Sequence, residues 1–210
     1  MSRRWTSSRA AANRSGSASS RSPISASGTP APARVRTWTS RSKSDPQTGE
    51  FLVWDEAAGG RVSQPPAFQG GGGLVSTVDD YHAYFQMLLN HGMHGSEQIL
   101  SRPAVELMTT NHLTPEQQAA RDALYRNNVH LMFGQGQQGG WGFGMAVRTY
   151  RGDYAPIGQF GWDGGTGTTA YADPTNQLTG ILLTQVGLST PDSMRLIHDF
   201  WTTPYQPIDD

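Results

Sequence analysis

The sequence lacks cysteine and has few charged residues. With no cysteine in 210 residues, a disulfide scaffold, a thiolate zinc site and a thiol nucleophile are excluded. Charged residues make up 16% of the chain and hydrophobic residues 36%. Both fractions are below the averages of soluble domains. No apolar run approaches the roughly 18 residues of a membrane span, and no secretory signal is present, so we expect a cytoplasmic protein with no membrane partner.

The charges that are present divide the chain into two chemically different segments. Residues 1–44 carry nine Arg and Lys and no acidic residue, whereas residues 45–210 carry seven basic and 17 acidic residues. Such a change at Asp45 predicts that the two segments have different origins or different roles.

Residues 1–44 do not have the composition of a folded element. They contain 17 Ser and Thr, and Ile24 and Val35 are their only branched aliphatic residues, so disorder is expected. Three interpretations compete: a basic arm on nucleic acid, an organellar transit peptide, and DNA translated in a wrong frame. No nucleic-acid fold motif accompanies the basic residues, and prolines interrupt an amphipathic helix. We favour the wrong frame and expect no nucleic-acid partner.

From Asp45 onward the pattern is that of a folded domain with helices first. We expect a turn at 45–50, a strand at 51–54 and a helix that begins after Thr77, with Asp80 in a capping box. Tyr81, Tyr84, Phe85, Leu88 and Leu89 form one apolar stripe of this helix, and Gly92 ends it. Two shorter helices start at Ser101 and Thr114, and residues 127–140 read as a loop.

The second half of the domain predicts strands. Trp141, Phe143, Met145 and Val147 alternate with Gly142, Gly144, Ala146 and Arg148, which indicates a strand. Two further strands, at 168–173 and 178–186, flank a hairpin turn at 174–177. Pro191 opens a last helix with Met194, Ile197 and Trp201 on one stripe and Leu196 and Phe200 beside it. Helices followed by an antiparallel sheet and a terminal helix indicate an α+β fold.

No cofactor or metal is expected. The glycine pattern at 134–139 precedes a strand, whereas a dinucleotide site needs a helix there. His91 and His94 lie near two glycines without an obvious third ligand.

A glycine-rich segment at 158–168 is the most informative motif. Four glycines lie at the entry to a strand: Gly161, Gly164, Gly165 and Gly167. They indicate a backbone that another group approaches closely. The alternative is a tight turn at a sheet edge.

Several stretches together resemble one family. They are Gly70–Thr77 with the helix after it, Ile99–Pro103, Trp141–Gly144, and Gly161–Gly165 followed by Tyr171–Pro174. In order and spacing, residues from about 46 to 208 resemble the C-terminal half of the serine β-lactamase superfamily, which includes class C-type β-lactamases, DD-peptidases and family VIII carboxylesterases.

The resemblance implies part of a β-lactamase/transpeptidase-like fold and a site in which a Ser-x-x-Lys serine is acylated and then hydrolysed. The third box of that site maps to Trp162, Asp163 and Gly164. Gly165 matches the position whose backbone N–H helps to form the oxyanion hole. Trp162 stands where many members carry Lys or His. The carboxylesterase branch often carries Trp there, so the resemblance favours neutral esters.

The first two boxes of the family are not convincingly present. Ser40-Arg41-Ser42-Lys43 spells Ser-x-x-Lys, but no apolar residues surround it to lower the pKa of Lys43. Tyr125-Arg126-Asn127 spells Tyr-x-Asn, but it reads as a surface loop.

We therefore expect a β-lactamase-related serine hydrolase that is truncated and inactive alone. Its substrate would be a small ester or a β-lactam-like molecule, and an oligomer or a partner would cover an incomplete sheet. The alternative is a non-enzymatic or vestigial binding module with a basic, disordered N-terminal tail.

Overall fold

The computed structural model describes residues 41–45, 47–56, 76–127, 139–188 and 191–208. Every described residue belongs to one compact unit within residues 37–210. In chain order the elements are β1 (Arg41–Ser44), β2 (Phe51–Asp55), α2 (Val78–Leu89), β3 (Met93–His94), β4 (Glu97–Gln98), α3 (Arg102–Met108), α4 (Pro115–Asn127), β5 (Gly139–Trp141), β6 (Ala146–Arg148), β7 (Phe160–Gly164), β8 (Thr168–Asp173), β9 (Leu178–Leu182), α5 (Pro191–Thr202) and the 3₁₀ helix η3 (Thr203–Tyr205). Within these ranges no helix combines the length and the apolar character needed to cross a membrane.

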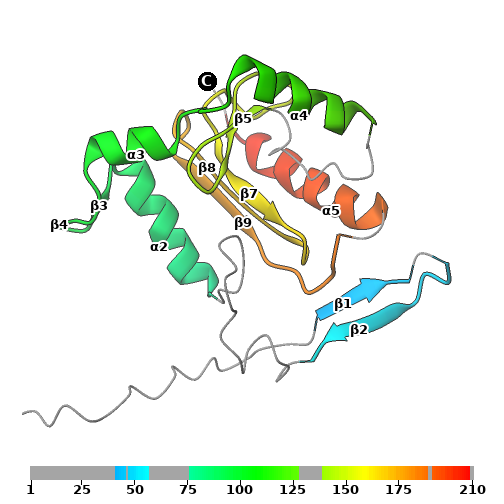
Figure 1. Cartoon of the computed structure of the whole chain (residues 1–210). Helices are drawn as coiled ribbons and strands as arrows, with labels where there is room; N and C mark the ends of the chain where they lie inside the picture. Colours follow the sequence, from blue (N-terminus) through cyan, green and yellow to red (C-terminus); the bar gives the residue numbers. More distant parts are fainter. Residues whose placement is uncertain (1–40, 46, 57–75, 128–138, 189–190, 209–210) are drawn as a thin grey trace, which may run out of the picture. The chain divides into compact units, whose positions relative to one another are not determined.

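A five-stranded antiparallel meander in the order β5-β6-β7-β8-β9 forms the centre of the described unit (Figure 1). β7 pairs with β8 from Phe160↔Ala172 to Gly164↔Thr168. β8 has its expected bounds, but β9 ends at Leu182 instead of continuing to residue 186. The chain leaves the ladder there, and the Thr184 hydroxyl donates to the Gly167 carbonyl at 2.7 Å. The α+β class is confirmed.

The single strand expected from Trp141 onward is wrong. β5 ends at Trp141, residues 142–145 turn back, and β6 begins at Ala146, which pairs with Trp141. Gly144 has φ +79°, a conformation that glycine adopts without steric cost. The alternation of large residues with glycine from Trp141 to Gly144 therefore corresponds to the end of one short strand and the turn that leads to the next. Gly139, expected in a loop, is the first residue of β5.

One face of the sheet packs against α2. Thr77 caps this helix by accepting the Asp80 N–H at 3.1 Å, and the Gly92 N–H donates to the Met87 carbonyl beyond its end. The predicted cap, stripe and stop are confirmed. The buried core on this face comprises Phe85, Met87, Leu88, Leu89, Val105, Met145, Val147, Phe160, Ala170 and Ala172.

The opposite face packs against α5 (Figure 1). Ile197 and Trp201 of the predicted stripe are buried with Tyr171, and the Trp201 Nε1–H donates to the Thr169 hydroxyl at 2.8 Å. The Tyr171 and Trp201 rings meet edge to face at 5.3 Å. Leu196, next to the stripe, is exposed.

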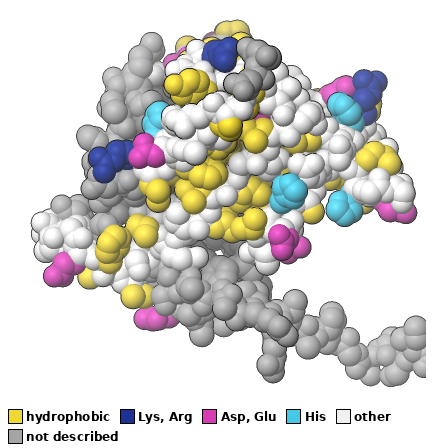
Figure 2. All heavy atoms as spheres, turned by 180° about the vertical axis from the view of Figure 1, so that it is seen from behind, with side chains coloured by type: hydrophobic (Ala, Val, Ile, Leu, Met, Phe, Trp, Pro, Cys, Tyr) yellow, Lys and Arg dark blue, Asp and Glu magenta, His cyan; other side chains and the backbone are white. Residues whose placement is uncertain are grey.

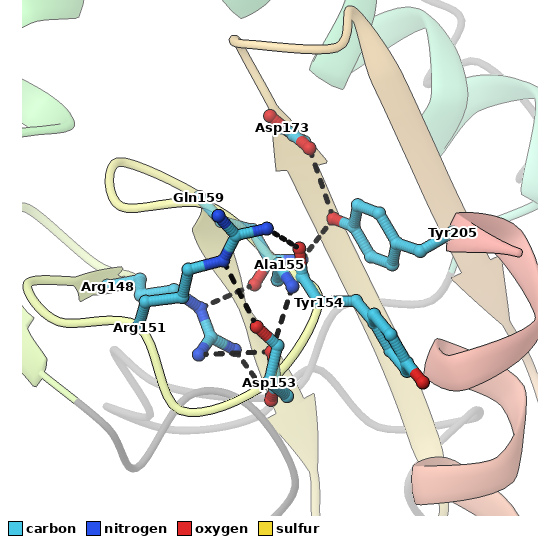
Figure 3. A network of polar contacts seen from close by, with 8 residues as sticks. All are labelled: Arg148, Arg151, Asp153, Tyr154, Ala155, Gln159, Asp173 and Tyr205. Carbon is cyan, nitrogen blue, oxygen red and sulfur yellow. Dashed lines mark hydrogen bonds and ion pairs between the residues drawn. The ribbon is translucent and has the colours of Figure 1, made fainter. Parts of the chain in front are cut away.

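A buried polar network ties the chain after α5 to the sheet (Figure 3). Arg148 Nε–H donates to the Gln159 side-chain oxygen at 3.1 Å, and the Gln159 amide donates to the Tyr205 hydroxyl at 3.1 Å. The Tyr205 hydroxyl in turn donates to Asp173 at 3.2 Å, and Arg148 forms an ion pair with Asp153 at 3.4 Å. Buried polar groups are tolerated when they are paired in this way. Burial, followed by the Asp173 charge, raises the pKa of Tyr205 far above its usual value.

The expected turn at 45–50 joins β1 and β2, with the Asp45 carboxylate accepting the Gln47 and Thr48 N–H groups. β1 lies within the segment for which disorder was expected, so folded structure begins at least four residues before Asp45. The Ser42 N–H donates to the Gln185 carbonyl, and the Gly187 N–H donates to the Ser42 carbonyl, each at 2.8 Å. These bonds join β1 to the segment that follows β9.

Candidate functional site

The glycine-rich segment forms the end of β7 and a tight turn into β8. The Gly167 N–H donates to the Gly164 carbonyl at 3.0 Å and closes this turn. Gly167 has φ +83°, and a Cβ there would overlap the Val186 carbonyl and the Thr184 hydroxyl oxygens. Only glycine fits this position, so the predicted tight turn is present.

Gly165, inside the turn, has an open side. The Gly164 carbonyl is held within the turn, and in a trans peptide the next N–H points the opposite way, so the Gly165 N–H is directed away from it. A Cβ added at Gly165 would meet no heavy atom within 4 Å, and its φ lies outside the left-handed region. The Leu188 N–H donates to the Gly165 carbonyl at 3.1 Å and fixes the other side of the residue. An N–H directed away from its turn, on a residue whose α-carbon borders open space, is suited to meet a developing oxyanion.

Trp162 and Asp163 lie on opposite faces of β7. Trp162 pairs with Ala170, a core residue of the α2 face, and is half-buried. Asp163 is 1% exposed, and on the α5 face its Oδ2 accepts a hydrogen bond from the Tyr171 hydroxyl, with 3.1 Å between the oxygens. Of the predicted third box, Trp162 and Gly164 therefore share the α2 face, whereas Asp163 supports the strand from behind.

Trp141, the last residue of β5, contacts Trp162 edge to face, with ring centroids 4.8 Å apart and an interplanar angle of 86°. The β6 ladder with β7 ends at the pair Ala146↔Gly161, so Trp162 lies just past it. The indole of Trp141 thus approaches Trp162 where the neighbouring strand has stopped.

Of the Ser-x-x-Lys match, the structure describes only the part from Arg41 onward. Ser40 lies outside the described residues, and Lys43 is exposed on β1. A Cβ placed on Gly187 would lie 3.7 Å from the Lys43 Cβ and 3.6 Å from the Gly165 carbonyl oxygen. β1 therefore passes close to the turn at 164–167, and the Lys43 side chain is exposed there.

The Tyr-x-Asn match at 125–127 ends α4, so the surface loop expected there is wrong. The Thr114 and Gln117 caps stabilise this helix reciprocally, and it continues through Asn127. Elsewhere, burial raises the pKa of Tyr81 and Tyr84 on α2, so both phenols hold their protons more tightly than a free tyrosine. Across the described ranges, no three His, Cys, Asp or Glu residues gather closely enough to hold a metal ion.

Sequence reasoning missed two partners of the third box, Trp141 and Tyr171. Both contacts join different strands, whose pairing register was not predicted. The only local signal was the period-two pattern of β8, which places Tyr171 on the same face as Thr169.

A family model described as Beta-lactamase matches residues 24–198. Two curated relatives from Mycobacterium tuberculosis strains, "Uncharacterized protein MT1414" and "Protein Rv1367c", are each 35% identical over 130 residues. That alignment covers 58% of this chain and 30% of each relative.

Solved structures of simvastatin synthase (LovD) from Aspergillus terreus have a similar fold. The unliganded enzyme superposes with a TM-score of 0.60 at 18% identity, and the LovD9 mutant with 0.63 at 19%. Each match covers 79% of this chain and 40% of the solved chain, so the sequence spans less than half of the proteins it matches.

Proposed function

Because the chain belongs to the β-lactamase family, we propose that its described residues form the sheet wall of a serine hydrolase site for acyl esters. The observation that carries this proposal is the Gly165 backbone: its N–H is directed away from the Gly164 carbonyl, and a Cβ added to the residue would meet open space. In this role the N–H would donate to the oxygen of the tetrahedral intermediate, where negative charge develops only during the reaction.

The proposed substrate is a neutral ester. Trp162 occupies the third-box position that carries a cation or an imidazole in many members of the family. An indole offers no charge to pair with a substrate carboxylate, and desolvating an unpaired carboxylate is costly. An apolar or aromatic acyl group would instead gain contact with the ring.

The proposed reaction is acyl transfer through a serine. The hydroxyl attacks the ester carbonyl while a desolvated lysine takes its proton, the alcohol leaves with a proton, and water then releases the acid from the acyl-enzyme. Lys43 is exposed, so we assign the nucleophile to a part of the protein outside the described residues.

The role of the Gly165 N–H is tested with variants of the native protein that are expressed in, and purified from, its source organism. Gly165→Pro removes the N–H, and Gly165→Ala keeps it and adds a methyl group where space is open. We expect the proline variant to lower kcat for p-nitrophenyl butyrate by about 10²–10³-fold with little change in KM. The alanine variant should fold with the wild-type Tm, and equal kcat values in wild type and Gly165→Pro would refute the assignment.

The substrate class is tested separately with Trp162→Lys. A cation at this wall should shift the preference of the native enzyme from neutral esters toward carboxylate-bearing ones, because it supplies the missing charge partner. An unchanged ratio of kcat/KM values for the two esters would mean that Trp162 does not face the substrate.

The second candidate is a binding module without catalysis. The exposed position of Lys43 favours it, since the one Ser-x-x-Lys match in the sequence then has no desolvated base. Such a module would retain the third-box wall and bind esters without acylation.

A further inference from the structure

Trp141 occupies the edge of β7 at the point where the strand loses its neighbour. β6 pairs with β7 only at Val147↔Phe160 and Ala146↔Gly161. Trp162, the next residue of β7, is paired with β8 on one side and meets the Trp141 indole at 4.8 Å. Trp141 therefore stands where a further strand residue would have covered the third box.

The backbone of Trp141 is held by hydrogen bonds to the segment that follows α3. Its N–H donates to the Asn111 side-chain oxygen at 2.9 Å, and its carbonyl accepts the His112 N–H at 2.9 Å. The flanking glycines leave no room for side chains: a Cβ on Gly140 would overlap Asn111, and one on Gly142 would overlap the Met108 carbonyl. Residues 108–112 thus fix Trp141 in place, and its ring has a defined partner in Trp162.

We infer that Trp141 is a positioning and specificity-determining residue, which holds the Trp162 ring and completes an apolar wall that selects neutral acyl groups over carboxylate-bearing ones. This inference rests on the proposed function. The perpendicular contact places the positive edge of one indole against the negative face of the other, the arrangement that aromatic pairs prefer. A Trp162 ring held in this way presents a fixed apolar surface, and fixed surfaces bind with less loss of conformational entropy.

The contact itself has a spectroscopic signature. Two indoles in contact couple their electronic transitions, and within the described ranges the recorded indole–indole contact is the one between Trp141 and Trp162. We expect the far-UV circular dichroism couplet of the 210-residue chain to disappear in Trp141→Phe and Trp141→Ala. It should remain in Trp54→Phe, the matched control on β2. A couplet that survives in both Trp141 variants would contradict the contact.

The role in selection is tested by binding two probes to the same variants, with Kd measured by ligand-observed NMR. Dimethyl adipate and monomethyl adipate differ in a single charge at one end. We expect wild type and Trp54→Phe to prefer the neutral diester, and Trp141→Ala to bind it about five- to tenfold more weakly. Trp141→Phe should recover part of that loss, because it restores an aromatic ring.

The outcomes separate this inference from the proposed function. Equal diester affinity in wild type and Trp141→Ala would overturn the role of Trp141 while leaving the site intact. Should wild type bind neither ester, the site itself is wrong and the inference fails with it. If Trp141→Ala does not fold, Trp141→Phe decides: a lost couplet with weakened diester binding supports the role, and unchanged binding refutes it.

Discussion

Tyr205 is the residue on which the buried network of the α5 face converges. Its hydroxyl accepts from Gln159 and donates to Asp173, and through Gln159 it reaches the buried Arg148 (Figure 3). Because all three partners are buried, none of them can replace a lost bond with bulk water.

Replacing Tyr205 should destabilise the fold without changing its shape. Tyr205→Phe keeps the ring and removes the hydroxyl, which leaves Gln159 and Asp173 without a partner there. We expect a loss of about 1–3 kcal/mol in the free energy of unfolding. Urea denaturation measures it, with Tyr154→Phe on an exposed ring as the control. A Tyr205→Phe midpoint equal to that of the control would contradict the role of the network.

The raised pKa of Tyr205 also predicts how stability changes in alkali. The phenol ionises at its ordinary pKa in the unfolded chain but resists ionisation in the folded one, so its contribution is complete below about pH 10 and is lost as the pH rises toward the raised value. Burial raises the pKa of Tyr81 and Tyr84 in the same direction, so the decline has several sources. Thermal unfolding of wild type should therefore show a falling Tm above about pH 10, with a shallower fall in Tyr205→Phe.

At the scale of elements, the helices depend on local capping residues that can be recognised in the sequence. Thr77 caps α2, Ser101 caps α3, and Thr114 with Gln117 caps α4. Thr77→Ala should lower the stability of the fold by about 0.5–2 kcal/mol, because α2 then loses the acceptor for the Asp80 N–H. Ser76→Ala, which removes a hydroxyl outside the cap, should have little effect. Equal denaturation midpoints for the two variants would show that the cap is dispensable.

The helices were predictable for this reason, whereas several strand ends were not. Caps and stripes depend on residues three or four apart, so α2 could be predicted from Thr77 to Gly92. Strand ends depend on partners elsewhere in the chain: β9 stops because Thr184 turns to Gly167, and β5 stops because residues 142–145 turn back. The third-box residues were proposed through the family resemblance. The partners of Trp162 and Asp163 lie on other strands, so the sequence did not predict them.

At the scale of the molecule, apolar surface is left uncovered. β2 has four consecutive exposed apolar residues, with Phe51 66% and Val53 55% exposed, and β9 is one of the two edge strands of the five-stranded sheet. Figure 2 shows hydrophobic side chains that reach the surface in several places on one face. Exposed apolar patches and open strand edges both favour association.

We therefore expect the purified 210-residue chain to aggregate or to oligomerise, unless a partner covers the open edge of its sheet. Analytical ultracentrifugation across a range of concentrations measures this, and lysine substitutions at Phe51 and Val53 should shift the distribution toward monomer. A monomer at all concentrations, with cooperative thermal unfolding, would contradict the expectation.

The Arg/Ser-rich segment calls for a measurement on the native protein. The family match begins at residue 24, and β1 begins at Arg41, both upstream of the change in charge at Asp45. Tryptic peptides from residues 1–44 in the native protein would exclude a wrong reading frame. If the frame is wrong, we expect peptides from an alternative frame that contain a Ser-x-x-Lys in an apolar helical setting.

The most direct test of the proposed serine hydrolase maps where a fluorophosphonate probe reacts. The account predicts that the native protein is labelled on a serine outside residues 45–210, and that the purified 210-residue chain is not labelled on Ser40, because Lys43 is exposed to water. Stoichiometric label on Ser40, lost in Ser40→Ala and in Lys43→Ala, would contradict the assignment of the nucleophile. A native protein that carries no label on any serine would contradict the hydrolase itself.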